Sequence, residues 1–172
     1  PKSGLLMTDA GSTAKADQVM TSLVQAIDGL VVRLLHTQTS PQAAMAHWLS
    51  SREAPLGFSV ERECELKAAD ESKSVVRYAR HALDTDEVAQ HIAQGKLPTR
   101  LALTWNDRVG FVLTDSLQIK KLAFLDTVFE NAGTSQTEED EFDANVAIAT
   151  GELRQLLPAL IVALGGEEVI PG

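Results

Sequence analysis

The basic residues of this sequence are concentrated in one segment, and such a distribution is typical of a surface that binds phosphate. Between Lys73 and Lys121 there are eight basic and five acidic residues, whereas residues 1–72 contain six and nine and residues 122–172 contain one and ten. A basic face flanked by acidic surfaces binds a phosphate backbone in one orientation only. The alternative is that these cations form an ordinary mixed-charge surface exposed to water.

Lys96 illustrates the two alternatives at a single position. It directly follows Gly95, where a helix is expected to end. A cation at that place stabilises the negative end of the helix dipole. The same cation could instead contact a phosphate, and the sequence leaves both roles open.

A second candidate for chemistry is the run Glu63-Cys64-Glu65-Leu66-Lys67. On a strand, alternate residues share a face, so a carboxylate and an ammonium group would lie together as in many metal-dependent nucleases. The upstream aspartate that such a site requires is missing from any convincing strand end. A divalent-metal nuclease is therefore only a third hypothesis.

The acidic run Glu138-Glu139-Asp140-Glu141-Phe142-Asp143 has two interpretations. Its carboxylates could bind a divalent ion. More commonly such a run begins a helix, where acidic side chains complement the positive end of the helix dipole. We favour the second interpretation.

Other familiar catalytic and metal-binding motifs are absent from the sequence. The sequence has no phosphate-binding glycine loop ending in Lys-Ser or Lys-Thr, no Gly-x-Ser-x-Gly motif and no Cys-x-x-Cys pair. The four histidines have neither helical spacing nor a nearby cysteine, so no zinc site is predicted. The single cysteine, Cys64, cannot form an intramolecular disulfide and is expected to be a buried thiol in a reducing compartment. We expect no cofactor.

Length and composition are those of a globular chain. With 172 residues, 44% of them hydrophobic, there is material for one well-buried domain or two small ones. The apolar stretch from Leu156 to Leu164 is too short to cross a bilayer and contains a proline, so we expect no membrane-spanning helix. The start of the chain resembles no secretion signal and lacks a methionine, which suggests a fragment or a processed product.

The first third of the chain is expected to alternate short strands and helices, up to a boundary at residues 51–56, where Pro55 precedes Gly57. Ser12 and Thr13 are candidate helix caps, and so are Thr39 and Ser40 before Pro41. The expected elements are a strand at Gly4–Thr8, a helix ending near Asp28, a strand at Leu30–Leu35 and a helix from Pro41 through Trp48.

The rest of the chain is expected to form a mostly antiparallel sheet with packed helices, which is an α+β fold. Its clearest feature is a hairpin with a two-residue turn at Asn106-Asp107. A turn with an even number of residues would place two sets of residues on one face of the hairpin: Leu101, Leu103 and Trp105 from the first strand, and Arg108, Gly110 and Val112 from the second. The expected elements are strands at Phe58–Leu66, Ser74–Leu83, Leu97–Trp105, Arg108–Asp115 and Ile119–Leu125, a helix from Asp84 to Gly95, and a helix from Glu138 to Leu164 bent near Pro158.

Several runs along the chain resemble one family, the bacterial recombination-associated protein RdgC. Their order and spacing match those of the family over nearly the whole chain. The runs are Gly4-Leu5-Leu6-Met7-Thr8-Asp9, His91-Ile92-Ala93-Gln94-Gly95-Lys96, Leu101-Ala102-Leu103-Thr104-Trp105, Lys120-Lys121-Leu122-Ala123-Phe124, Phe142-Asp143-Ala144, Thr150-Gly151-Glu152-Leu153 and Leu164-Gly165-Gly166-Glu167.

The resemblance implies a non-enzymatic protein that binds double-stranded DNA largely without sequence preference. It implies a ring-shaped homodimer that restrains RecA-driven recombination, cytoplasmic and associated with the nucleoid, with no role at membranes. The match is to the C-terminal part of the family chain. Residues 1–52 would then belong to a central α+β domain whose N-terminal portion is missing, and residues 53–172 to a C-terminal base domain.

The family's DNA-contacting strand matches the residues from Val75 to His81. Arg77 and Arg80 keep its charge, whereas Ala79 replaces a lysine and His81 replaces a glutamine. The DNA-contacting residues implied by the resemblance and by the charge distribution are Arg77, Arg80, His81, Lys96, Arg100, Arg108, Lys120 and Lys121.

One further class of function remains open. The acidic C-terminal helix could bind a protein partner, with the basic segment serving only solubility. Retention on a DNA column at low salt separates this protein-interaction module from the DNA-binding hypothesis.

Overall fold

The computed structural model describes residues 4–129 and 138–168. Its contacts divide the chain into two compact units, one before and one after the Leu35–His36 bond. Each unit is described by itself below. The larger unit begins upstream of the boundary expected at residues 51–56, while the assignment of family domains to the two parts stays a prediction.

The described part of the first unit, residues 4–35, contains one helix, α1, which spans Thr13–Ala26. The side chain of Ser12 caps it by accepting a hydrogen bond from the backbone N–H of Lys15 at 3.3 Å, as predicted. The two short strands expected at Gly4–Thr8 and Leu30–Leu35 are wrong, because both segments are irregular. An apolar run becomes a strand only when another strand pairs with its backbone, and neither run has one.

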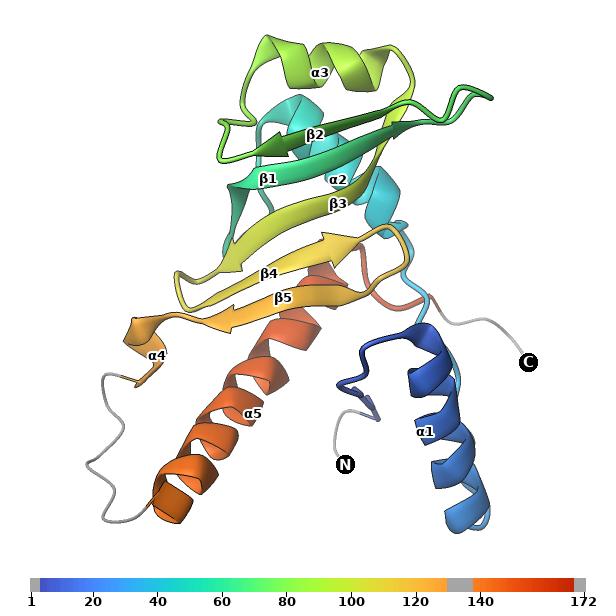
Figure 1. Cartoon of the computed structure of the whole chain (residues 1–172), viewed down its shortest axis with the longest axis vertical. Helices are drawn as coiled ribbons and strands as arrows, with labels where there is room; N and C mark the ends of the chain where they lie inside the picture. Colours follow the sequence, from blue (N-terminus) through green and yellow to red (C-terminus); the bar gives the residue numbers. More distant parts are fainter. Residues whose placement is uncertain (1–3, 130–137, 169–172) are drawn as a thin grey trace. The chain divides into compact units, whose positions relative to one another are not determined.

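The second unit begins with helix α2 (Pro41–Ser51), which is capped by the Ser40 side chain as predicted. A five-stranded antiparallel sheet follows in the order β2-β1-β3-β4-β5 (Figure 1). This arrangement confirms the α+β class. The strands are β1 (Phe58–Ala68), β2 (Val75–Ala79), β3 (Lys96–Trp105), β4 (Val109–Thr114) and β5 (Ile119–Phe124), and the further helices are α3 (Asp86–Ala93), α4 (Asp126–Phe129) and α5 (Glu138–Ala163).

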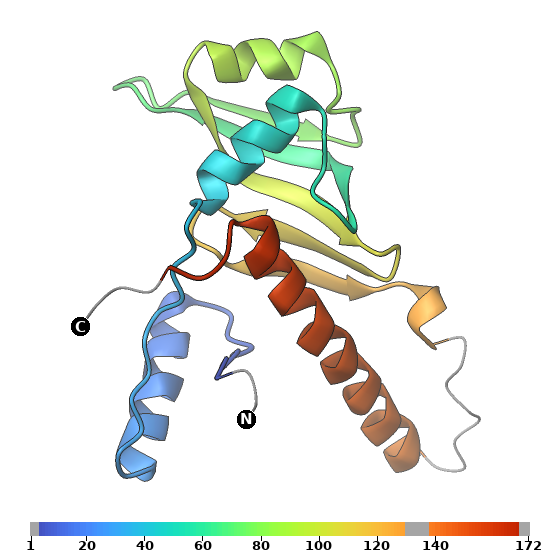
Figure 2. The ribbon, with the colours of Figure 1, turned by 180° about the vertical axis from the view of Figure 1, so that it is seen from behind.

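The helices of this unit pack on one side of the sheet. Figure 2 shows α2 lying across this face, with α3 beside α2 near β2, and the C-terminal end of α5 over the sheet while the rest of α5 extends beyond its edge. Side chains of the sheet and of these helices form one apolar core, with residues such as Met45, Leu66, Leu103 and Leu156 fully shielded from solvent. No described helix of this unit covers the opposite face, which is called the open face below.

The predicted hairpin is present, but its turn is one residue longer than expected. Asn106 and Asp107 both have positive φ, as predicted, yet Trp105 pairs with Val109 and Arg108 remains in the turn. Because side chains alternate along a strand, this extra residue reverses the faces of β4. The expected face of Leu101, Leu103 and Trp105 with Arg108, Gly110 and Val112 is therefore wrong: these three residues share the core face with Val109, Phe111 and Leu113.

Helix α5 is continuous through Pro158 and begins at Glu138, which confirms the acidic run as the start of a helix. Its segment Phe142–Ala163 has the length and composition of a membrane span, contrary to the expectation drawn from the shorter apolar stretch. Leu153, Leu156 and Leu160 on this segment are nevertheless buried in the core of the second unit. Within this unit, the C-terminal half of α5 therefore packs on the core through one apolar face, while its N-terminal part exposes apolar side chains such as Phe142.

Candidate nucleic-acid interface

The open face contains a row of polar side chains that crosses four strands. Arg77 of β2 pairs with Glu65 of β1, Glu65 pairs with Arg100 of β3, and Arg100 pairs with Thr114 of β4. Residues directly opposite each other in antiparallel strands project from the same face. The register therefore brings together two of the predicted DNA-contacting residues, Arg77 and Arg100, which are 23 positions apart in the chain.

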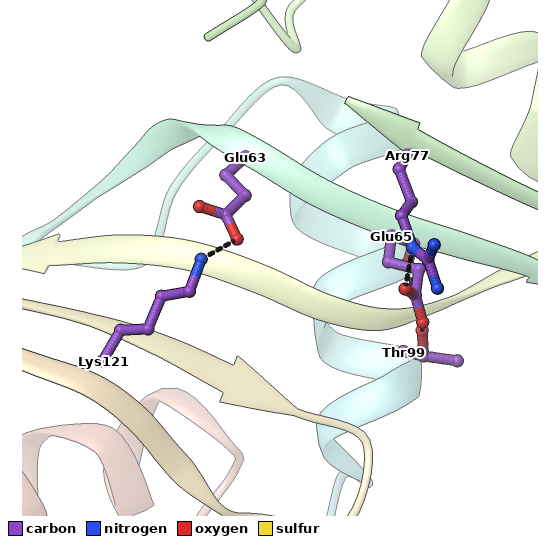
Figure 3. A network of polar contacts seen from close by, with 5 residues as sticks. All are labelled: Glu63, Glu65, Arg77, Thr99 and Lys121. Carbon is purple, nitrogen blue, oxygen red and sulfur yellow. Dashed lines mark hydrogen bonds and ion pairs between the residues drawn. The ribbon is translucent and has the colours of Figure 1, made fainter. Parts of the chain in front are cut away.

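Glu65 lies at the centre of this row and is held from two sides. Its carboxylate accepts hydrogen bonds from Arg77 Nε at 2.6 Å and from Thr99 Oγ1 at 2.8 Å (Figure 3). The bonds from Arg77 and Thr99, with the charges of Arg77 and Arg100, hold the pKa of Glu65 below its ordinary value despite partial burial. Glu65 is therefore a fixed negative charge between two arginines.

Strand β5 contributes two consecutive lysines to the same face. In a regular strand, neighbouring residues point to opposite faces. The register of β4 and β5 shifts between Gly110 and Val112, and Lys121 has a φ of 50°. This bulge lets Lys120 line a hollow on the open face while Lys121 reaches Glu63 on β1, with Nζ 2.5 Å from Oε1 (Figure 3).

The hollow itself is shallow, about 250 Å³ in volume, and is lined from β1, β3, β4 and β5. Its cations are Lys67, Arg100 and Lys120, and its acids are Glu65 and Asp115. Within the described ranges, none of these three cations forms an ion pair, whereas Glu65 is already bonded to Arg77. The hollow thus has three cations beside two acids, one of which is already bonded to Arg77, together with the hydroxyl groups of Thr99, Thr114 and Ser116.

Two of the predicted residues, Lys96 and His81, lie away from this surface. Lys96 shares its side of β3 with the buried Pro98, and its Nζ is 3.3 Å from His91 Nδ1 on α3. The ring of His81 packs 5.5 Å from that of Tyr78, which is buried on the core side. Neither Lys96 nor His81 therefore lies in the row formed by Arg77 and Arg100.

Arg108 is bound elsewhere. From the turn between β3 and β4 it forms an ion pair with Glu152 of α5, which is buried. Arg80 is exposed just beyond the end of β2, in a backbone conformation with φ of 56°. The structure thus brings Arg77, Arg100, Lys120 and Lys121 to the open face, while Lys96, His81 and Arg108 contact other elements.

Lys67 and Thr99 belong to the surface but are missing from the predicted DNA-contacting residues. In the sequence, Lys67 is a candidate only as part of the acid-x-Lys pattern, and nothing in the local sequence marks Thr99. A second register shift, between Glu65 and Leu66 of β1, allows Thr99 to reach Glu65. Only the alternation of β1 could have indicated that Lys67 shares a face with Glu65.

The acid-x-Lys pattern does lie on one face, as expected, but its acids are engaged by cations. Glu63 pairs with Lys121 and Glu65 with Arg77. Among the residues that the structure describes, no group of three or more His, Cys, Asp or Glu side chains is placed to hold a metal ion. The neighbouring Cys64 is buried, as predicted.

The family model and the similar proteins that match this chain carry the same family name. A family model described as "Putative exonuclease, RdgC" matches residues 1–167. Curated proteins named recombination-associated protein RdgC are similar over nearly all of this chain: that of Dechloromonas aromatica is 53% identical over 98% of the chain, and that of Cupriavidus pinatubonensis 52% identical over 97%.

The match covers only part of each relative. The chain spans 57% of the Dechloromonas protein and 56% of both the Cupriavidus protein and the Janthinobacterium protein, the last being 49% identical. The name of these relatives associates them with recombination. Because the family model covers almost the whole chain and identity with the relatives is near one half, this chain belongs to the RdgC family.

Proposed function

We propose that this chain binds double-stranded DNA through the open face of its sheet, without catalysing a reaction. The observation that carries the proposal is the hollow in which Lys67, Arg100 and Lys120 have no ion-pair partner among the described residues, flanked by Arg77 and Lys121. Cations distributed over several strands suit the repeating negative charge of a DNA backbone. The hydroxyl groups that line the hollow can donate hydrogen bonds to phosphate oxygens.

The composition of this surface favours binding without sequence preference. Its cations are lysines and arginines on the strands of a sheet, at positions suited to contact phosphates. Phosphate contacts set the position of a protein on DNA but carry no direct information about base sequence. We therefore expect affinity that depends strongly on salt and only weakly on sequence.

The family name supports a role in recombination, and we propose that DNA binding is how the protein restrains RecA-mediated strand exchange. A homodimer that closes around DNA needs two separate contacts between its subunits. We propose that the protein forms such a homodimer, and closure around the duplex should slow its dissociation from DNA.

A salt titration of duplex affinity tests the DNA site. We expect a slope of log affinity against log salt of roughly −3 to −4, about one unit for each phosphate neutralised. Replacing Lys67, Arg100 and Lys120 together with glutamine should make the slope shallower by about 3. A control that replaces the exposed Lys15, Arg33 and Arg154 with glutamine makes the same change in net charge. Equal effects of the two variants would contradict the placement of the DNA site.

The word exonuclease in the family description calls for a direct test of cleavage. Duplex and single-stranded DNA, labelled at one end, are incubated with the protein and Mg²⁺ or Mn²⁺. We expect no shortening, because Glu63 and Glu65, the acids closest to the pattern of a metal nuclease, are paired with Lys121 and Arg77. Shortening that is lost in a Glu65→Gln variant would overturn the non-enzymatic proposal.

One observation favours protein binding as a second function. The N-terminal part of α5 exposes Phe142 and Val146, with 67% and 45% of their surface accessible. Exposed apolar side chains beside acidic residues suit a protein contact. If the chain binds a partner but is not retained on a DNA column at low salt, the interaction module replaces the DNA-binding proposal.

A further inference from the structure

Two ion pairs flank the hollow on the open face, and they differ in how firmly they hold their cations. The pair of Lys121 with Glu63 is exposed, with 65% of the lysine side chain and 43% of the glutamate side chain accessible. Glu63 makes no other side-chain hydrogen bond among the contacts of the described chain. Exposed ion pairs of this kind contribute little to stability and exchange readily with solvent ions.

The pair of Arg77 with Glu65 is built differently. Only 14% of the Glu65 side chain is accessible, and Thr99 holds the same carboxylate. Arg77 uses Nε for this contact, and 74% of its side chain is accessible. Figure 3 shows its terminal nitrogens turned away from Glu65. Glu65 can therefore remain bound to Arg77 while those nitrogens bind another anion.

Lys121 differs from Arg77, because its positive charge is a single ammonium group and has no second set of nitrogens that could bind another anion. Glu63 Oε1 lies 2.5 Å from Nζ, in direct contact with the ammonium group, where a phosphate oxygen could take its place as the anionic partner. The bulge with positive φ at Lys121 is an unfavourable backbone conformation for a lysine. It is nevertheless the conformation that directs this side chain across the open face.

We propose that Glu63 occupies the place of a DNA phosphate at Lys121, so that duplex binding displaces this carboxylate. The inference rests on the proposed DNA-binding function and adds to it a residue that limits affinity. Glu63 competes with the DNA backbone for one cation, whereas Glu65 fixes a neighbouring cation without blocking it. Because Glu63 is released on binding, it lowers the affinity for DNA without lowering the number of phosphates that the open face neutralises.

The variant Glu63→Gln tests this inference, because it removes the competing charge and keeps the size of the side chain. We expect duplex affinity to increase about threefold to tenfold while the salt slope stays nearly the same, because Lys121 already neutralises a phosphate in the unmodified complex once Glu63 is displaced. The matched control is Glu53→Gln, an exposed glutamate just after α2 with the same change in net charge. It should leave both quantities almost unchanged.

A double-mutant cycle with Lys121→Gln shows whether the effect passes through the lysine. In the Lys121→Gln background, Glu63→Gln should increase affinity no more than Glu53→Gln does. Circular dichroism of each variant checks that the sheet is intact. A gain that persists without Lys121 would mean a general charge effect and would overturn the inference.

The outcomes also separate this inference from the proposed function. If the unmodified chain binds duplex and Glu63→Gln does not bind more tightly than the control, the competition is absent while the DNA-binding proposal stands. If only Glu63→Gln binds at low salt, competition by Glu63 is supported and is strong enough to prevent binding. If neither binds, both proposals are wrong.

Discussion

Arg108, in the turn between β3 and β4, donates two hydrogen bonds to the carboxylate of Glu152 on α5, from Nε at 3.0 Å and from Nη2 at 2.6 Å. The residue Glu152 is only 6% exposed. A two-point contact between a guanidinium and a carboxylate fixes orientation as well as distance. It joins the hairpin turn to the helix that covers this end of the sheet, and it explains why Arg108 is not available on the open face.

Removing one partner of this pair should destabilise the fold. Arg108→Met leaves a buried carboxylate without its cation, and we expect the free energy of unfolding to fall by about 1–3 kcal/mol. Urea denaturation followed by circular dichroism measures the change. The double variant Arg108→Met/Glu152→Leu should recover much of the loss, because no unpaired charge is then buried. A double variant less stable than Arg108→Met alone would contradict this explanation.

The same pair predicts a dependence of stability on pH. Arg108 holds the pKa of Glu152 below its ordinary value of 4.5, mainly through the hydrogen bonds to its side chain. A carboxylate with a lowered pKa in the folded state stabilises the protein above its ordinary pKa, and this contribution is lost as the pH falls through the folded-state value. The free energy of unfolding of the unmodified chain, relative to that of Arg108→Met/Glu152→Leu, should therefore be constant from about pH 7 to about pH 5. It should decrease below about pH 4, as Glu152 becomes protonated. A difference that changed mainly above pH 5 would point to another titrating group.

A side chain added at Gly57 should destabilise the fold. Its φ is 82°, and an added Cβ would lie 3.1 Å from Asn106 Oδ1 and 3.6 Å from Trp105 Nε1. We expect Gly57→Ala to lower the free energy of unfolding by about 1–2 kcal/mol, measured by urea denaturation. Gly110→Ala is the control, since its nearest neighbours would be 3.9 Å away. Equal losses in both variants would show that backbone conformation is not the cause.

The thiol of Cys64 should be unreactive while the chain is folded. Burial raises its pKa to about 12, so almost none of it is thiolate at neutral pH. We expect negligible reaction with a thiol reagent under native conditions and complete reaction in denaturant. Rapid native labelling would mean that β1 opens locally.

Local signals in the sequence determined most helices and the hairpin. Ser12 and Ser40 cap α1 and α2 because a side-chain oxygen can satisfy a free N–H of the first turn without any help from distant residues. Asn106 and Asp107 adopt the positive φ expected of a tight turn. The same local reasoning failed for Leu30–Leu35, because a strand needs a partner and no local signal says whether one exists.

The sequence by itself also determined that positive charge is concentrated between Lys73 and Lys121, and the family resemblance followed from runs of residues along the chain. Only the tertiary structure decided which cations meet. The register of β1 with β2 and β3 brings Arg77 and Arg100 to one row, and a bulge brings Lys120 and Lys121 to the same face. One additional residue in the turn placed Arg108 against Glu152 instead. The face on which a strand residue lies changes with every single-residue shift in register, and register depends on pairing between distant segments, so local sequence could not predict the site.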